Sequence, residues 1–199
     1  MELDGVRGHD AQAENGDARD AAVVVPVLER DDGPQLLFTK RADHLSNHPG
    51  QMSFPGGRRE PGDEDLQATA AREAHEEVCL EPEELEVVGR LDDIRTVTGF
   101  SVRPFVARVP DREYEPCEHE VAEVAILPVR ALTDLDNYYS EFRDHPHYGR
   151  IRLHYFYVDG YTVWGATARI LVQFLELVTD WSIPADADAV VDADADYPM

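Results

Sequence analysis

Three glutamates in one short segment are placed to act together. The segment REAHEEVCL, residues 72–80, puts Glu73, Glu76 and Glu77 at relative positions i, i+3 and i+4. On a helix this spacing brings all three carboxylates to one side, within about 100° of arc. Carboxylates about 5 Å apart repel by about 3 kcal/mol per pair at an effective dielectric near 20. We expect Arg72 to reach one edge of this arc and not its middle, so a hard divalent cation with oxygen ligands fits the arc better.

The composition of the whole chain allows a simpler interpretation of the same glutamates. The 199 residues include 41 aspartates and glutamates against 18 lysines and arginines, a formal net charge of -23. In so acidic a chain, roughly two triplets with this spacing are expected by composition alone, and they would form a solvated acidic face. The residues around the glutamates must decide between the two interpretations.

The charge balance also bears on partners and compartment. Lys40 is the sole lysine, and an acidic, lysine-poor chain of ordinary apolar content is typical of a halophile's cytosolic protein. Its negative field repels nucleic acid and anionic membranes, so we exclude both as partners. No stretch approaches the ~20 apolar residues of a membrane span, and no signal peptide opens the chain. Cys79 and Cys117 form neither a metal-ligand spacing nor a disulfide framework. We therefore expect a reducing, cytoplasmic location.

The segment before the glutamates adds a second kind of ligand group. In FPGGRREPGDED, residues 54–65, Gly56 and Gly57 follow a short predicted strand. Paired glycines permit positive φ and bring bare backbone N–H groups close to a ligand, although they also suit a plain turn. Carboxylates for a metal beside backbone donors for oxyanions would make a site for a phosphate group.

The hydrophobic pattern divides the chain into three parts. Residues 1–20 are expected to be a disordered acidic leader, residues 21–180 a folded domain, and residues 181–199 an acidic mobile tail. A helix is predicted from Asp63, as its cap, to about Val78. The remaining segments predict strands over 21–29, 35–41, 84–94, 98–109, 120–127 and 151–160, a short helix over 128–134 and a last helix over 166–178. This order predicts an α/β protein with a mixed sheet between helices.

Residues 56–80, GGRREPGDEDLQATAAREAHEEVCL, resemble the Nudix box. This loop–helix–loop belongs to hydrolases that cleave a nucleoside diphosphate linked to another group. Its core, Arg-Glu-x-x-Glu-Glu, is met by Arg72 and the three glutamates. The chain departs from the box in two places: one extra residue separates Gly57 from Glu64, and Cys79 stands where the box has glycine. A side chain at this helix end would cost about 1 kcal/mol if the backbone there is left-handed.

Two further stretches resemble one branch of the superfamily, the coenzyme A diphosphatases. LLFTKRADHLSNHPGQMSFPGG, residues 36–57, matches the upstream signature of that branch through Arg41, His48, Gly50 and the Phe-Pro-Gly-Gly at its end. VWGATARIL, residues 163–171, matches its Trp-Gly-x-Thr-Ala segment at the start of the last helix. The extra residue in the box is also a feature of this branch. The resemblance runs from about residue 21 to residue 178.

The resemblance implies a fold, a reaction and a cofactor. The fold would be the Nudix α/β/α arrangement, a mixed β-sheet sandwiched between helices. The reaction would be metal-dependent hydrolysis of the diphosphate of coenzyme A or its derivatives to 3′,5′-ADP and 4′-phosphopantetheine, or an acyl form of it. Other substrates of the superfamily, such as ADP-ribose or NADH, stay open as alternatives, as does a Nudix-fold binding module without catalysis. No oligomeric state is predicted.

The resemblance also assigns roles to individual residues. Glu73, Glu76 and Glu77 would hold Mg²⁺ or Mn²⁺, Arg72 would orient a ligating glutamate, and the Gly56–Gly57 backbone would position the diphosphate.

Other residues have two possible roles each. Arg41 and His48 would bind substrate, or else be a surface charge and a histidine that bonds the backbone. Glu120 or Glu123, on a predicted strand after the box, would be the general base. Residues 138–150 would contact the pantetheine arm or form a hairpin loop. Trp164 and Gly165 are expected to pack at the start of the last helix.

Overall fold

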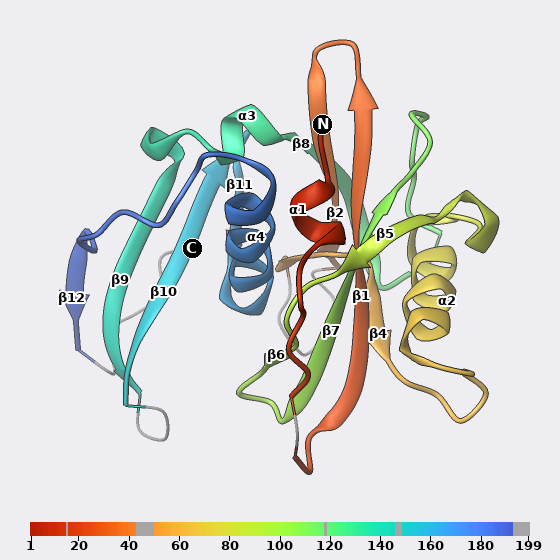
Figure 1. The fold of residues 1–199 in the computed structure, drawn as a ribbon, viewed down its shortest axis with the longest axis horizontal. Helices are drawn as coiled ribbons and strands as arrows, with labels where there is room; N and C mark the ends of the chain where they lie inside the picture. The colour runs from red at the N-terminus through yellow and green to blue at the C-terminus, as the bar shows by residue number, and fades with distance from the viewer. Residues whose placement is uncertain (15, 43–49, 118, 146–148, 193–199) are drawn as a thin grey trace.

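The protein has two β-sheets with one helix outside the larger sheet and one helix between the two (Figure 1). The structure is a computed structural model, and it describes residues 1–14, 16–42, 50–117, 119–145 and 149–192. The larger sheet, called sheet A, has the strand order β3-β2-β1-β7-β5, with β4 also paired to β1, β6 to β7 and β8 to β2. The smaller one, sheet B, has the order β11-β10-β9-β12.

The elements follow the chain in an order close to the predicted one. The strands of sheet A are β1 (Arg19–Arg30), β2 (Gly33–Arg41), β3 (Met52–Ser53), β4 (Gly56–Arg58), β5 (Glu86–Arg90), β6 (Ile94–Arg95), β7 (Phe100–Arg108) and β8 (Val121–Pro128). Those of sheet B are β9 (Tyr138–His145), β10 (Gly149–Val158), β11 (Tyr161–Trp164) and β12 (Ala189–Val191). The helices are α1 (Asp4–Arg7), α2 (Leu66–Val78), α3 (Val129–Leu132) and α4 (Gly165–Val178), with 3₁₀ turns η1 (Pro82–Glu84) and η2 (Leu135–Asn137).

Strand β1 makes sheet A a mixed sheet. It pairs parallel with β7 on one side and antiparallel with β2 on the other, while β4 extends the second side near the start of β1. Every second residue of β1 faces the same layer. Val25 and Val27 face α4 and sheet B, whereas Ala22 and Val24 face α2. The predicted α/β fold with a mixed sheet between helices is therefore confirmed.

Helix α2 lies close against the outer face of sheet A because its buried residues are mostly small. Ala70 and Ala74 are at most 1% exposed and pack against Ala22 and Phe105 of the sheet. Helix α4 is different, since Ile170, Phe174 and other large apolar residues fill the space between sheets A and B. The small buried face of α2 brings its backbone near the strands, so the next arc of its surface emerges beside β4.

The N-terminal segment is part of the core, so the expectation of a disordered leader over residues 1–20 does not hold for its first turn. Leu3 and Val6 are each 1% exposed and belong to the main hydrophobic cluster. Helix α1 lies against α4 and β5, and Gly5 is so close that a Cβ there would sit 1.9 Å from the carbonyl oxygen of Leu177. The burial of these two apolar side chains contributes to ordering an otherwise polar segment.

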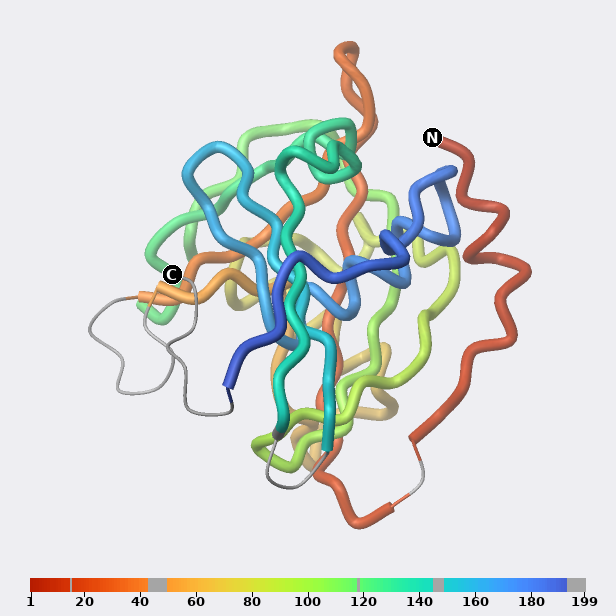
Figure 2. The backbone as a smooth tube through the Cα atoms, turned by 90° about the vertical axis from the view of Figure 1, so that its left-hand side faces the viewer, coloured from red at the N-terminus to blue at the C-terminus, as the bar shows by residue number. Residues whose placement is uncertain are grey.

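The segment after α4 is also ordered in part, against the expectation of a mobile tail over residues 181–199. Trp181 is 9% exposed, and its ring meets those of Tyr138 and Phe156 edge-on or tilted. Figure 2 shows the chain beyond it, in dark blue, crossing to run beside β9, where β12 pairs parallel with that strand. The tail prediction therefore fails up to residue 192, and residues 193–199 lie outside the described residues.

The aromatic stretch 138–150 includes strand β9 and the start of β10, which pair as the two arms of a β-hairpin. Its first part is β9, which pairs antiparallel with β10 from Tyr138 opposite Phe156 to His145 opposite Gly149. Residues 146–148 at the turn lie outside the described residues. Throughout the described ranges, no helix has the length and apolar character needed to cross a membrane.

Candidate metal and diphosphate site

Helix α2 begins at Leu66, and its cap lies two residues later than predicted. Asp65 is its N-cap, since its side chain accepts a hydrogen bond of 2.8 Å from the backbone N–H of Ala68. Asp63 was predicted to be the cap and is not. Its carboxylate instead accepts hydrogen bonds from Oγ1 of Thr69 at 2.9 Å and from Nε of Arg72 at 3.0 Å. Asp63 thus fastens the loop before the helix to the middle of the helix.

Arg72 is the centre of a cluster of carboxylates. Its Nη1 lies 3.1 Å from Oε1 of Glu73 and 2.9 Å from Oε2 of Glu76, and its Nη2 donates to the carbonyl of Arg58 at 2.9 Å. The expectation that Arg72 reaches only one edge of the glutamate arc is therefore wrong. Glu76 lies one turn further along the helix, within reach of the long arginine side chain. The hydrogen bond from Arg72 also holds the pKa of the Asp63 carboxyl well below its usual range.

Strand β4 passes directly against two of the three glutamates. A Cβ at Gly57 would lie 2.5 Å from Cδ of Glu73, so only glycine leaves room for that carboxylate. The backbone N–H of Gly56 donates to Oε2 of Glu77 at 3.2 Å. Gly56 itself has φ of 154°, and a Cβ there would meet the carbonyl oxygen of Ala22 at 2.3 Å. Gly57 therefore allows the close approach of β4 to α2, and Gly56 allows that of β4 to β1 while its N–H bonds Glu77.

The three glutamates are brought together unequally. Glu73 and Glu77 lie one turn apart over the glycines, whereas Glu76, whose side chain is 39% exposed, pairs with Arg72. Among the residues that the structure describes, no group of three or more His, Cys, Asp or Glu side chains is arranged to hold an ion. The donors of Glu73 and Glu77 are carboxylate oxygens, which Mg²⁺ and Mn²⁺ accept. Glu73 and Glu77 are therefore the candidate ligands of a hard divalent cation, and this assignment stays a prediction.

The two candidate bases are placed differently relative to sheet A, with Glu120 in the loop before β8 and Glu123 within β8. Arg41 donates to Oε2 of Glu120 at 3.2 Å, and the backbone N–H of Cys117 donates to the carbonyl of Glu77 at 2.9 Å. The loop that carries Glu120 therefore reaches the end of α2. Glu123 instead accepts a hydrogen bond from the hydroxyl of Tyr161, which packs against the cluster between the sheets.

This placement separates the two glutamates in space. Lys40 lies 3.9 Å from Glu123 and two residues after Phe38 on β2. Residues two apart on a strand share a face, so Lys40 points with Phe38 away from α2. Glu123 therefore lies on the face of sheet A away from α2, whereas the loop that carries Glu120 contacts the last turn of α2 through Cys117. His48, the other predicted substrate ligand, lies outside the described residues.

Comparison with known proteins places this site in a family. The family model for the NUDIX domain matches residues 18–147, which include the whole glutamate arc. The chain belongs to the Nudix hydrolase family. It is 43% identical over 157 residues to the "Uncharacterized Nudix hydrolase NudL" of Enterobacter sp. (strain 638), covering 77% of this chain and 79% of that protein. The protein of the same name from Cronobacter sakazakii is 42% identical over 155 residues, with the same coverage.

A solved Nudix structure agrees with the fold. The crystal structure of a MutT/nudix family protein from Enterococcus faecalis matches with a TM-score of 0.56 and 14% sequence identity, over 84% of this chain and 64% of that one. At this identity the match bears on the fold alone. The mixed sheet with α2 on its outer face is thus a Nudix fold.

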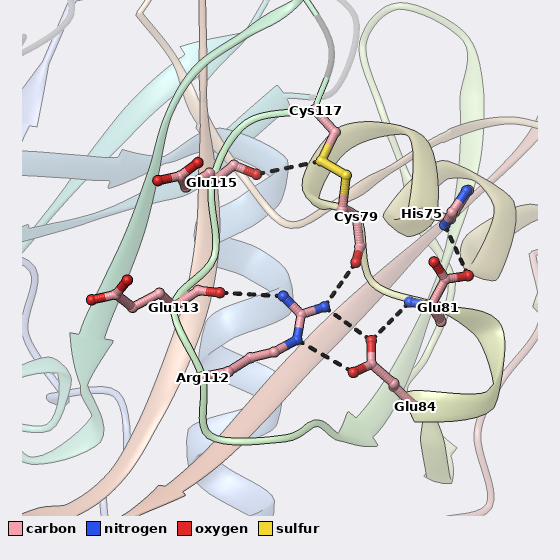
Figure 3. The surroundings of a disulfide bond; sticks show 8 residues. All are labelled: His75, Cys79, Glu81, Glu84, Arg112, Glu113, Glu115 and Cys117. Carbon is pink, nitrogen blue, oxygen red and sulfur yellow. Dashed lines mark hydrogen bonds and ion pairs between the residues drawn. A yellow bond between two sulfur atoms is a disulfide. The ribbon is translucent and has the colours of Figure 1, made fainter.

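The end of the Nudix helix is fastened by a disulfide, which the sequence interpretation missed. Cys79, at the glycine position of the box, is the C-cap with φ of 51° and ψ of 38°, as the box led us to expect. Its sulfur is bonded to that of Cys117, 38 residues away (Figure 3). The prediction of unpaired cysteines is therefore wrong, and the argument for a reducing compartment loses its basis. Two cysteines in a chain carry no signal of their distance in space.

An arginine reinforces the same helix end. Nη2 of Arg112 donates to the carbonyl of Cys79 at 2.8 Å and lies 2.9 Å from Oε2 of Glu84 (Figure 3). The hydrogen bond from Arg112 lowers the pKa of the Glu84 carboxyl. Together with the disulfide, Arg112 fixes where α2 stops, one residue after Val78.

The Trp-Gly segment packs at the start of α4, as predicted. Trp164 is the residue before the helix, and Gly165 has a positive φ of 66° at its first position. Oγ1 of Thr167 donates to the carbonyl of Met52 at 3.1 Å, which joins the helix to β3. The segment therefore connects sheet A to α4.

Proposed function

We propose that this Nudix hydrolase cleaves the diphosphate of coenzyme A or its derivatives, giving 3′,5′-ADP and 4′-phosphopantetheine or its acyl form. The observation that carries the proposal is the close approach of Glu73 and Glu77 to the paired glycines of β4. Carboxylates and bare backbone beside each other suit a metal ion and a diphosphate together. The choice of coenzyme A rests on the sequence of residues 36–57 and 163–171, which resemble that branch of the family.

Each residue of the site has a distinct task in this proposal. Glu73 and Glu77, with Glu76, would hold Mg²⁺ or Mn²⁺. When bound, the ion neutralises diphosphate charge and activates a water for attack on phosphorus. Arg72 bonds both Glu73 and Glu76 and so offsets their mutual repulsion, and Asp63 holds Arg72 in place.

We assign the proton acceptor to Glu120 rather than Glu123. Glu120 lies in the loop that joins the end of α2, whereas Glu123 faces the space between the sheets. The Glu120 side chain is 55% exposed, so water can reach its carboxylate, and Nη1 of Arg41 lies 3.2 Å from it. In the same proposal Arg41 binds an oxyanion of the substrate when Glu120 turns to the water.

A substrate panel tests the proposal directly. The purified chain is incubated with coenzyme A, ADP-ribose and NADH, each with Mg²⁺ or Mn²⁺, and the products are resolved by mass. We expect 3′,5′-ADP and 4′-phosphopantetheine from coenzyme A, and no product from Glu77→Gln. If ADP-ribose or NADH is hydrolysed and coenzyme A is not, the proposed substrate is wrong and the proposed reaction stands. No turnover of any of the three by the intact site would favour a binding module.

The assay is best run in concentrated salt. We propose that the chain works at high ionic strength, because its net charge of -23 makes the folded state repel itself when screening is weak. Activity and the unfolding temperature should both rise from about 0.1 M to about 1 M KCl as the Debye length falls from about 10 Å to about 3 Å. A decline of both over this range would remove the halophile interpretation.

A further inference from the structure

A cavity lined by three arginines, three acidic residues and a phenylalanine opens at one end of sheet A, beside the candidate metal site. It has a volume of about 470 Å³, which is in the range of small-molecule sites. Figure 1 shows the starts of β1 and β7 together at the lower end of the sheet, and the loop after β4 descends on the same side. The lining residues are Arg19, Asp20, Arg58, Arg59, Glu60, Pro61, Asp63 and Phe100.

Two arginines of this cavity share one aromatic ring. The guanidinium carbon of Arg19 lies 4.0 Å from the ring centroid of Phe100, and that of Arg58 lies 5.1 Å from it. Arg19 is the direct neighbour of Phe100 in the parallel pairing of β1 with β7, whereas Arg58 comes from β4 on the other side of β1. Stacking on the ring holds both guanidinium groups in place without using their hydrogen-bond donors. Nη2 of Arg19 also donates to the carbonyl of Thr98 at 3.0 Å, a neutral acceptor that leaves the charge in place.

Arg19 and Arg58 differ from the other arginines around the cavity in their charge partners. Within the described ranges, neither Arg19 nor Arg58 forms an ion pair with a carboxylate, in a chain that has 41 acidic residues. The acidic lining residues Asp20 and Asp63 serve other arginines: Asp20 lies 3.9 Å from Arg59, and Asp63 bonds Arg72. Glu60, also in the lining, is exposed and offers its backbone N–H to Asp63. Two positive groups are thus left facing the cavity.

The cavity is linked to the candidate metal site through Asp63 and Arg58. Asp63 lines the cavity and bonds Arg72, which in turn bonds Glu73. Arg58 follows Gly57, the residue against which the Glu73 carboxylate lies. A diphosphate held at Gly56–Gly57 carries one group on each phosphorus. One of these two groups could therefore reach the cavity.

We propose that this cavity is a subsite for a phosphate monoester of the substrate, with Arg19 and Arg58 as its ligands and Phe100 as their support. Two guanidinium groups bind a dianionic phosphate through charge-assisted hydrogen bonds. In coenzyme A, that phosphate is the 3′-phosphate of the ribose. The assignment to coenzyme A rests on the function proposed above, whereas the affinity for a phosphate monoester does not.

The test compares coenzyme A with dephospho-coenzyme A, which lacks the 3′-phosphate. In the double variant R19Q/R58Q, kcat/KM for coenzyme A should fall about tenfold more than kcat/KM for dephospho-coenzyme A, mainly through KM. The matched control is R130Q/R150Q, which also removes two exposed positive charges. Arg150 likewise stacks on a phenylalanine, with its guanidinium carbon 4.4 Å from the ring centroid of Phe142, and Arg130 lies in α3 at the opposite end of sheet A (Figure 1). The control should leave the ratio of the two substrates unchanged.

A binding measurement separates this subsite from the proposed reaction. The metal-free protein is titrated with 3′,5′-ADP and with 5′-AMP in a calorimeter. The parent should bind 3′,5′-ADP more tightly, and R19Q/R58Q should lose that preference while R130Q/R150Q keeps it. If no coenzyme A is hydrolysed but this pattern holds, the subsite stands and the proposed substrate falls. Equal binding of the two nucleotides by the parent, or an unchanged preference in R19Q/R58Q, overturns the subsite.

Discussion

The backbone N–H of Gly56 donates a hydrogen bond to Oε2 of Glu77, 3.2 Å away, across 21 positions of the sequence. This contact joins β4 to the last turn of α2 and fixes a carboxylate where the helix dipole disfavours it. Opposite it, Gly57 makes room for Glu73. The two glycines and the two glutamates are therefore one unit, in which the strand sets the position of the carboxylates.

Replacing Glu77 by glutamine should abolish activity and keep the fold. The amide oxygen of the new side chain can still accept the hydrogen bond from Gly56, so the unfolding temperature should change by less than a few degrees. The negative charge that binds the metal is lost, and turnover should fall by orders of magnitude. The control is Glu83→Gln, an exposed glutamate of η1 that loses the same charge away from the site. Near-normal turnover by Glu77→Gln would refute its role as a ligand.

Replacing Gly57 by alanine should displace the Glu73 carboxylate, because the added methyl group takes its space. The new Cβ would lie 2.5 Å from Cδ of Glu73, and the flexible end of that side chain can move away. We therefore expect a loss of about 1 kcal/mol in the free energy of unfolding and at least a tenfold loss of activity. Gly62→Ala is the matched control, because a Cβ there meets nothing within 4 Å.

Metal binding by the two glycine variants shows whether the loss of activity in Gly57→Ala comes from the metal site. Calorimetric titration with Mn²⁺ should show weaker binding for Gly57→Ala and unchanged binding for Gly62→Ala. If both variants bind Mn²⁺ as the parent does, the close approach of Gly57 to Glu73 has no part in the metal site.

Removing the disulfide should loosen the end of the Nudix helix. For a cross-link between residues 38 positions apart, the chain-entropy account gives about 3 to 4 kcal/mol of stability. Cys117→Ser should lower the free energy of unfolding by this amount, and a reducing agent should lower that of the parent but not that of the variant. Labelling of the denatured, unreduced parent with a thiol reagent checks the premise. Two reactive thiols would show that the bond is not formed in solution.

The helix and its carboxylates could be predicted because their signals are local. The spacing of Glu73, Glu76 and Glu77, and the small residues Ala70 and Ala74 beside them, belong to one helix and are visible in one segment. The paired glycines before the helix could be predicted for the same reason. These features depend on neighbours within a few turns, so the sequence and the Nudix resemblance were enough.

The features that were missed depend on contacts between distant segments. Leu3 and Val6 are isolated apolar residues in a polar stretch, and only the surface of α4 and β5 makes them part of the core. Asp63 looked like a helix cap, but Asp65 took that role because Arg72, nine positions away, bonds the Asp63 carboxylate. The pairing of Cys79 with Cys117 likewise requires the position of the loop before β8. None of these three outcomes follows from local propensity.

Buried His154 gives a prediction about pH that is independent of the active site. Its side chain lies between the sheets and the end segment, 8% exposed, with Nδ1 2.6 Å from the hydroxyl of Tyr138. Burial, with the nearby charges of Arg152 and Arg169, lowers the pKa of His154 from 6.5 to about 4. Between these two values the unfolded chain binds a proton that the folded protein does not, so stability falls as the pH falls.

The expected loss from His154 between pH 6.5 and pH 5 is about 2 kcal/mol in the free energy of unfolding. It is measured by chemical denaturation at constant ionic strength, as the difference between the parent and His154→Gln, whose amide can still bond Tyr138. Taking the difference removes the contribution of the many carboxylates, which titrate alike in both proteins. His119→Gln, which removes an exposed imidazole, should keep the slope of the parent. If the free energy of unfolding of His154→Gln changes with pH as that of the parent does, the imidazole of His154 binds its proton equally well in the folded and unfolded chain. Its burial then has no effect on stability in this pH range.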